Sequence, residues 1–385
     1  MGICTSKSTK PRQISQPNLH KQPPKSALTD QRAPEINKVI VNDKEQKLHQ
    51  DIEKYLQKEK EIYDKERNEP RILILGPSDS GKSTFLKQLK IIHGNGFTKQ
   101  ELIVTKKSLL FNLFGIAQYV LKELPSEDIV AFEPLMSYTR NLAITQIPPN
   151  IIHNLWEFWN HPLCKQKYLE LNSLFPHTSG HFFDRILQIG AEDYEMTPDD
   201  MLLFRAVTQQ ISDNVFEINN RNEKHRLHFI DVSGLKYHRK RWIPYFQDVL
   251  AIIFVVDLSG YDLMLSESKD INRMVDAIEL FHHIINHPLL LKPDMILFFN
   301  KTDLFTVKVN TSPIQMHFPD YTGQLGDIEA GITFFTDKFR NQCRNKAKHI
   351  SIHRTCCTDT SLMNRIINDV VYLILKNVVQ DMVGL

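Results

Sequence analysis

Glycine is scarce in this chain, with 14 glycines in 385 residues, whereas about 7% is usual. A glycine-dense motif in such a chain therefore carries more information than it would in a glycine-rich one. Cysteine is rare as well, and the five thiols stand at positions 4, 164, 343, 356 and 357. Their spacing fits neither a disulfide framework nor a set of metal ligands, which indicates a protein of a reducing compartment.

The chain has no long hydrophobic run. Its longest apolar run, residues 249–256, spans eight residues, far short of the roughly 20 that cross a bilayer. The first ten residues hold no apolar segment of secretory length, so we expect no export. Neither sign of charge is in excess, because 47 basic and 45 acidic residues leave a formal net charge of +2. We therefore do not expect nucleic acid as a partner.

The first 34 residues contain five prolines, six basic residues, one acidic residue and no aromatic residue. Such a composition cannot build a core, so we predict a disordered basic arm over residues 1–42. Residues 43–69 have a narrow apolar stripe at helical spacing among many charges and are followed by Pro70, which predicts one long helix. This helix either lies on its own domain or offers its stripe to another protein, and the sequence does not decide between the two.

From residue 71 onward, short apolar runs alternate with helix-like segments. The predicted strands are 71–75, 225–230, 251–256, 295–299 and 350–355, and the clearest helices are 269–285 and 362–379. This alternation predicts an α/β fold, a mostly parallel sheet with helices on both faces, formed by residues 70–95 and 200–385. Residues 96–199 lack strands and predict an inserted all-helical domain, with Trp156 and Trp159 in its core.

A phosphate-binding loop follows the first predicted strand. The motif G-x-x-x-x-G-K-[ST] is formed by Gly76, Pro77, Ser78, Asp79, Ser80, Gly81, Lys82 and Ser83, and Thr84 continues into a helix. Glycines let backbone N–H groups curl around phosphate oxygens, Lys82 reaches the β- and γ-phosphates, and the Ser83 hydroxyl ligates Mg²⁺. The motif therefore predicts binding of a nucleoside triphosphate with Mg²⁺.

Two further motifs end later strands. Asp231 can hold Mg²⁺ through water, and the N–H of Gly234 can approach the γ-phosphate. Asn300, Lys301 and Asp303 form N-K-x-D, in which the Asp303 carboxylate can accept two hydrogen bonds that guanine offers and adenine does not. These residues favour guanine and argue against an ATP-dependent kinase. The loop after residue 355, with Cys357, is placed to cover the base edge.

These motifs together resemble the α subunits of heterotrimeric G proteins. Residues 76–93, 261–268, 298–305 and 355–360 are similar to that family's own segments in the same order, and the helical insert falls where the family has its helical domain. The resemblance implies a P-loop, Ras-like GTPase domain that binds GTP or GDP. Small monomeric GTPases share the nucleotide motifs but lack the insert.

The resemblance also implies roles for residues 200–208, which match the family's D-x-L-x-x-R-x-x-T segment. Arg205 is implied to be the catalytic arginine and Thr208 the second side chain on Mg²⁺ beside Ser83. The intervening residues are implied to contact the nucleotide: Met201, Leu202, Leu203 and Phe204.

Four positions depart from the family pattern. In the family's D-V-G-G-Q-R segment, Ser233 replaces the first glycine and Leu235 replaces the glutamine that orients the attacking water. Gln210 replaces a glycine, and Cys357 replaces an alanine. We expect nucleotide binding to persist and GTP hydrolysis to be weak, unless Gln209 or Gln210 supplies the missing contact. The alternative is a GTP-bound scaffold that does not cycle.

The family resemblance implies partners and a location. They are a βγ dimer, a seven-transmembrane receptor, a downstream effector and the cytoplasmic face of the plasma membrane. Met1 to Ser6 matches M-G-x-x-x-[ST], so Gly2 is a candidate for myristoylation, and Cys4 for palmitoylation. The family usually carries its cysteine at the third residue, where this chain has Ile3. One acyl chain binds a membrane only weakly, so two chains with a basic arm form a sufficient anchor.

Overall fold

The computed structural model describes residues 54, 69–125, 127, 129–138, 147–171, 174–206, 211–220, 223–265 and 268–383. Contacts divide the chain into a unit of residues 1–67 and a unit of residues 68–385. The predicted arm and long helix lie outside the described residues, except for Lys54, which is helical, and Glu69, which lies in a bend.

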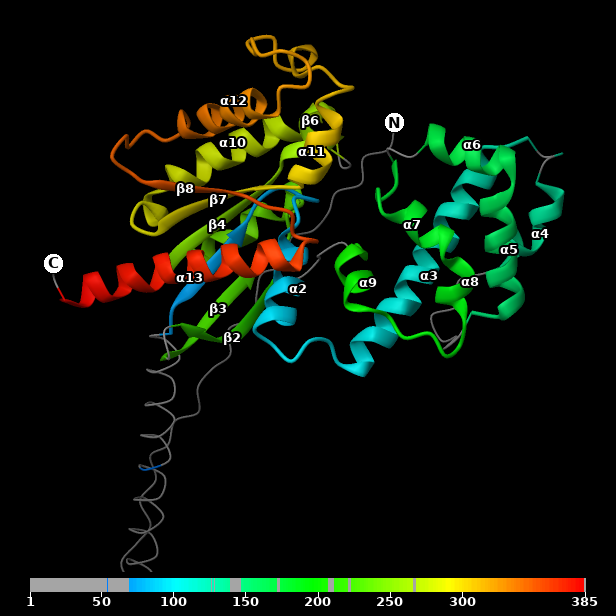
Figure 1. Ribbon diagram of the computed structural model, residues 1–385, viewed down its shortest axis with the longest axis horizontal. Helices are drawn as coiled ribbons and strands as arrows, with labels where there is room; N and C mark the ends of the chain where they lie inside the picture. The colour runs from blue at the N-terminus through cyan, green and yellow to red at the C-terminus, as the bar shows by residue number, and fades with distance from the viewer. Residues whose placement is uncertain are drawn as a thin grey trace, which may run out of the picture. The chain divides into compact units, whose positions relative to one another are not determined.

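A six-stranded sheet organises the second unit (Figure 1). In spatial order its strands are β2 (Ser212–Asn220), β3 (Glu223–Asp231), β1 (Arg71–Leu75), β4 (Val249–Asp257), β7 (Asp294–Asn300) and β8 (Ile350–Arg354). Every neighbouring pair is parallel except β2 and β3. The predicted α/β fold with a mostly parallel sheet is therefore confirmed.

Both faces of the sheet are covered by helices, because the inner strands are apolar on both sides. In β1, Ile72 and Ile74 face one core and Leu73 and Leu75 face the other. Figure 1 shows α2 (Lys82–Ile92) and α13 (Thr360–Val383) on one face, with α10 (Arg273–Ile285) and α12 (Ile328–Arg340) on the other. The short helix α11 (Thr302–Lys308) follows β7.

Two details of the sheet domain differ from the expectation. Strand β2 was not predicted, because its sequence SDNVFEINN is mostly polar. Residues 269–272, expected to be helical, belong to strand β6 (Ser268–Asn272), which pairs with β5 (Met264–Leu265). Helix α10 starts only at Arg273, because Asn272 is its N-cap and accepts hydrogen bonds from the N–H groups of Met274 and Val275.

The segment between α2 and β2 contains helices and connecting turns but no strand in its described residues. Its helices are α3 (Lys99–Lys122), α4 (Glu133–Ser137), α5 (Pro149–Asn160), α6 (Pro162–Glu170), α7 (Ser179–Asp184), α8 (Ile186–Gly190) and α9 (Pro198–Leu203). They enclose a separate apolar core (Figure 1). Trp159 lies in that core at 6% exposure, but Trp156 is 38% exposed, so the prediction of a buried Trp156 is wrong.

Helix α9 spans the predicted domain boundary at residue 200. Its Met201 and the following Phe204 pack into the core of the helical segment. The exact boundary stays a prediction, because residues 68–385 form one compact unit.

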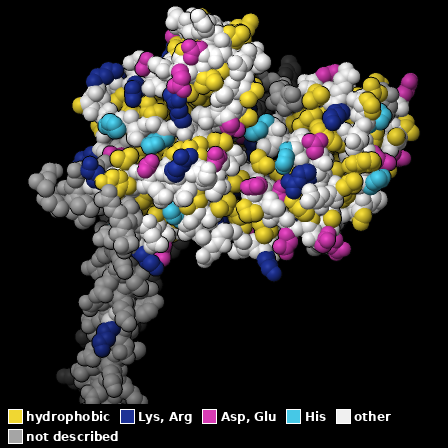
Figure 2. Space-filling view, in the orientation of Figure 1, with side chains coloured by type: hydrophobic (Ala, Val, Ile, Leu, Met, Phe, Trp, Pro, Cys, Tyr) yellow, Lys and Arg dark blue, Asp and Glu magenta, His cyan; other side chains and the backbone are white. Residues whose placement is uncertain are grey.

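The described surface carries mixed charges. On the face drawn in Figure 2, basic and acidic side chains are interspersed over the described residues without a large block of one sign. Among these residues, no helix combines the length and the apolar character needed to span a membrane.

Candidate functional site

The loop between β1 and α2 has a backbone that only glycine can adopt at two positions. Gly76 and Gly81 have φ angles of +143° and +106°. A Cβ at Gly76 would lie 2.2 Å from the Val255 carbonyl oxygen, and one at Gly81 would lie 2.0 Å from Asn300 Nδ2. The two glycines of the motif are therefore required by the fold of the loop itself.

Lys82 begins helix α2, and its side chain returns over the loop. Its Nζ donates hydrogen bonds to the carbonyl oxygens of Gly76 (3.0 Å) and Pro77 (2.7 Å). Gly234 approaches the same place, since a Cβ there would lie 2.5 Å from Lys82 Nζ and 2.5 Å from the Ser78 nitrogen. The backbone after β3 thus lies directly against the loop, next to its only lysine.

Ser83 and Asp231 are brought together across the sheet end. Ser83 Oγ donates a hydrogen bond to Asp231 Oδ2 at 3.1 Å, while the buried Oδ1 has no hydrogen-bond partner. Burial raises the pKa of the Asp231 carboxyl. A hydroxyl beside a carboxylate with an unused oxygen fits Mg²⁺, which keeps several waters and binds through few protein oxygens. The described residues contain no cluster of three or more His, Cys, Asp or Glu side chains that could hold a metal alone.

Asn300 ties three loops together at the carboxyl ends of the strands. Its Nδ2 donates to the Ser80 carbonyl oxygen (2.8 Å), and its Oδ1 accepts from the Cys357 N–H (3.0 Å). The Gln88 side chain holds the Cys357 carbonyl oxygen at 2.9 Å. Asn300 therefore links the loop after β8 to the phosphate-binding loop.

Lys301 and Asp257 form an ion pair beside these loops. Lys301 Nζ lies 2.7 Å from Asp257 Oδ2. Burial by itself would raise the pKa of the Asp257 carboxyl, but Lys301, Ser259 and Arg273 outweigh it and hold that pKa below its ordinary value. The backbone of Lys301 is left-handed, with a φ of +59°, and caps α11, which carries Asp303 in its first turn.

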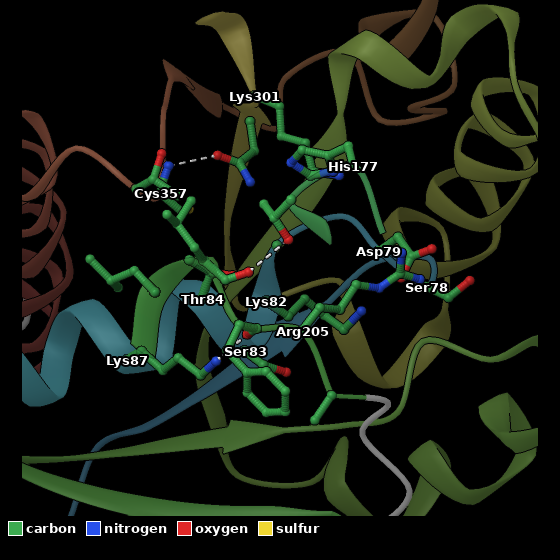
Figure 3. Close-up of a pocket in the computed structure, with 18 of the residues that line it drawn as sticks. Ser78, Asp79, Lys82, Ser83, Thr84, Lys87, His177, Arg205, Lys301 and Cys357 are labelled. Carbon is green, nitrogen blue, oxygen red and sulfur yellow. Dashed lines mark hydrogen bonds and ion pairs between the residues drawn. The ribbon is translucent and has the colours of Figure 1, made fainter. Parts of the chain in front are cut away.

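Arg205 lies two residues after the end of α9 and turns towards the phosphate-binding loop (Figure 3). Its guanidinium forms an ion pair with the Asp79 carboxylate, and Arg273 Nη2 lies 3.6 Å from the other oxygen of Asp79. Asp79 has a left-handed φ of +63°. This geometry brings an arginine of the helical segment within reach of the predicted phosphate-binding loop.

Lys87, on α2, caps the carboxyl end of α9. Its Nζ donates to the carbonyl oxygens of Met201 (2.8 Å) and Phe204 (2.7 Å) and lies 5.5 Å from the centre of the Phe204 ring. Burial lowers the pKa of the Lys87 amine to about 8. Lys87 thereby fixes the chain directly before Arg205.

His177 reaches the site from the helical segment and lies beside Lys301 in Figure 3. Burial lowers the pKa of the His177 imidazole, and the charge of Lys301 acts in the same direction. No sequence motif marks His177. Lys87, in contrast, stands four residues after Ser83 on one helix face and was open to inference from spacing.

One pocket collects most of the predicted nucleotide-binding residues: Ser78, Asp79, Gly81, Lys82, Ser83, Thr84, Leu202, Leu203, Phe204, Arg205, Gly234, Leu235, Asn300, Lys301, Asp303 and Cys357. Lining residues that were not predicted are Lys87, His177, Thr178, Ala206, Ser233, Leu304, Cys356 and Thr358. Of the described predicted residues, the following do not line the pocket: Gly76, Pro77, Ser80, Met201 and Asp231. Thr208, Gly2 and Cys4 lie outside the described residues.

Comparison with known proteins adds independent findings. The family model described as G-protein alpha subunit matches residues 46–374. A guanine nucleotide-binding protein alpha-2 subunit of Caenorhabditis elegans is 30% identical over 83% of this chain and 91% of its own length. A guanine nucleotide-binding protein subunit alpha of Sporothrix schenckii is 32% identical over 86% of this chain and 95% of its own length. A guanine nucleotide-binding protein subunit alpha-15 of Rattus norvegicus is 30% identical over 84% of this chain and 90% of its own length.

Proposed function

This chain belongs to the family of G-protein alpha subunits, and from that premise we propose that it is a guanine-nucleotide switch with weak GTP hydrolysis. The proposal assigns the pocket to GTP and GDP, with Mg²⁺, at the cytoplasmic face of the plasma membrane. A βγ dimer, a seven-transmembrane receptor and a downstream effector are its proposed partners.

The observation that carries the proposal is the meeting of separate motifs in one pocket. Lys82 and Ser83 come from the G-x-x-x-x-G-K-[ST] motif, Asp303 comes from N-K-x-D, and Arg205 comes from the helical segment. These residues are far apart in the sequence, and their spacing alone does not require that they line the same pocket.

Each group has a chemical task. Lys82 and the loop N–H groups bind the β- and γ-phosphates, and Asp303 accepts hydrogen bonds from guanine. Mg²⁺ would be held by Ser83, by Thr208 and through water by Asp231, and when bound it supplies positive charge against the phosphates. Arg205 turns from Asp79 to the transferring phosphoryl group, where negative charge develops.

Weak hydrolysis follows from Leu235. The residue lines the pocket, but an aliphatic side chain can neither accept a hydrogen bond from the attacking water nor donate one to a phosphate oxygen. Positioning that water is a large share of what a GTPase contributes. Leu235 therefore lowers hydrolysis without removing a contact that nucleotide binding needs.

Membrane attachment rests on sequence outside the described residues. Gly2 and Cys4 are the proposed sites of two acyl chains, and the basic residues of the arm add attraction to anionic lipid. The C-terminal residues are proposed to contact the receptor.

A second candidate function is a GTP-bound scaffold that does not cycle, favoured by Leu235 in the pocket wall. Two measurements on the purified chain decide between the functions: binding of labelled GTP with ATP as competitor, and hydrolysis of pre-bound GTP in a single turnover. A slow but finite rate, with no competition by ATP, supports the switch. Hydrolysis at the rate of buffer alone supports the scaffold, and competition by ATP would contradict both.

A further inference from the structure

Ser233 lines the pocket immediately before Gly234, two residues after the end of β3. It is 3% exposed, and its Oγ lies 2.9 Å from His238 Nδ1. The family pattern has glycine here, so this hydroxyl is a feature of this chain.

Neighbouring groups contact both residues of the pair. The buried Trp242 donates its Nε1 hydrogen to the Ser233 carbonyl oxygen at 3.1 Å. The backbone N–H of His238 donates a hydrogen bond to the Leu235 carbonyl oxygen at 2.9 Å. The rings of Tyr237 and His238 meet edge to face, with 4.3 Å between their centroids. In the sequence, Ser233 and His238 stand on either side of Leu235, the position where a hydrogen-bonding side chain is missing.

We propose that Ser233, oriented by His238, positions the attacking water in the residual GTP hydrolysis of this chain. The proposal rests on the proposed function, because it concerns GTP bound in the same pocket. A serine hydroxyl has one donor hydrogen and two acceptor lone pairs. When the hydrogen is donated to His238 Nδ1, the lone pairs accept a hydrogen bond from water.

The reaction itself is unchanged by this assignment. The water oxygen bonds to the γ-phosphorus, and the bond from that phosphorus to the bridging oxygen breaks with its electron pair left on the β-phosphate. One water proton moves to a γ-phosphate oxygen, which gives GDP and dihydrogen phosphate. Ser233 and His238 remove no proton. Ser233 contacts the water, and His238 is a positioning residue that acts through Ser233.

Ser233→Ala tests the contact directly. We expect single-turnover hydrolysis to fall about tenfold, the effect of one hydrogen bond of ordinary net strength. Affinity for a non-hydrolysable GTP analogue stays unchanged, because the hydroxyl is assigned to water and not to nucleotide. The matched control is Ser351→Ala, which removes a similar serine–histidine contact of 2.9 Å with His353 on β8.

His238 variants separate positioning from a structural role. His238→Phe keeps an aromatic ring but cannot accept from Ser233, so hydrolysis should fall as in Ser233→Ala. His238→Asn places an amide oxygen near the former Nδ1 and should restore most of the rate. Equal loss in the Phe and Asn variants would overturn the role of His238, and these two variants still test the pair where Ser233→Ala fails to fold.

A double substitution tests the assignment to water. In a Leu235→Gln background, the glutamine makes the hydrogen bond to water that we assign to Ser233. Ser233→Ala should then lower the rate of single-turnover hydrolysis less than twofold, because the effects of two residues that share one contact are not additive. An undiminished tenfold loss there contradicts the proposal, as does parental hydrolysis equal to buffer or to that of Ser233→Ala. Failure of the parent to bind GTP at all would overturn the proposed function and this inference with it.

Discussion

Arg205 is ion-paired with Asp79, so the arginine of the helical segment is held on the predicted phosphate-binding loop. An arginine of this kind contributes ~10³–10⁵ to the rate of GTP hydrolysis in GTPases, and α subunits are a known case. Because we propose that Leu235 already lowers the hydrolysis rate, we expect Arg205→Ala to reduce single-turnover hydrolysis by about 10²-fold, with GTP affinity nearly kept. Arg273→Ala is the control, since Arg273 lies near the same carboxylate but does not line the pocket. An equal loss of hydrolysis in both variants would mean that Arg205 acts by its ion pair with Asp79 and not by stabilising the transition state.

Asp303 is the residue to which we assign the base preference. Asp303→Asn replaces an acceptor pair by an amide, which can donate to the additional carbonyl of xanthine, so the preference should move from guanine to xanthine nucleotides by at least about tenfold. Competition binding with labelled GTP and unlabelled xanthosine triphosphate measures the shift. Asp320→Asn, which changes a carboxylate outside the pocket wall, should leave the preference as it is. Retained guanine selectivity in the Asp303 variant contradicts the assignment.

Contiguous motifs were readable from the sequence, whereas contacts made by folding were not. Gly76 to Ser83 form one contiguous motif after an apolar strand, so both the loop and its binding role could be predicted from the sequence. Strand β2 escaped prediction because an antiparallel edge strand can be polar. His177 comes from the helical segment and meets Lys301 only in the folded chain. The Ser233 contact with His238 required coordinates too, because Ser233 lies in the loop after β3 and His238 in the following 3₁₀ helix (Lys236–Tyr245), and the sequence does not fix how the two side chains face each other.

Lys87 links stability to pH. Its pKa is lowered by burial from 10.5 to about 8. Between these values the unfolded chain keeps a proton that the folded chain has released, so this group's contribution to the free energy of unfolding rises with pH across that window and is constant below it. Urea denaturation from about pH 7 to about pH 10 should show this rise in the parent relative to Lys87→Met. The exposed Lys99→Met is the control, and parallel curves for parent and Lys87→Met would contradict the link.

Gly2 is the proposed start of the membrane anchor. Gly2→Ala removes the acceptor of the myristoyl chain, and a palmitoyl chain on Cys4 alone binds weakly. Most of the protein should therefore move from the membrane fraction to the soluble fraction of cells that express it. Thr5→Ala leaves the motif's required residues intact and serves as control. An unchanged membrane fraction for Gly2→Ala would place the anchor elsewhere, such as in the βγ contact.

Leu235→Gln should raise single-turnover GTP hydrolysis by about tenfold or more. A glutamine amide can accept a hydrogen bond from the attacking water and donate one to a γ-phosphate oxygen, whereas leucine can do neither. The two side chains have similar bulk, so GTP affinity should be unchanged. Arg205 and Lys82 line the same pocket in the parent, so the gain is limited to positioning of the water.

The measurement needs a control for changed packing in the segment after β3. Leu235→Met has similar volume and no hydrogen-bond donor, so its rate should match the parent's. A rate increase in the methionine variant equal to that in the glutamine variant would point to mobility of the segment instead of water positioning. If the parent and Leu235→Gln hydrolyse GTP at the same rate, and that rate is the rate of an ordinary α subunit, another residue positions the water. A loss of that rate in Ser233→Ala would then identify Ser233 as that residue.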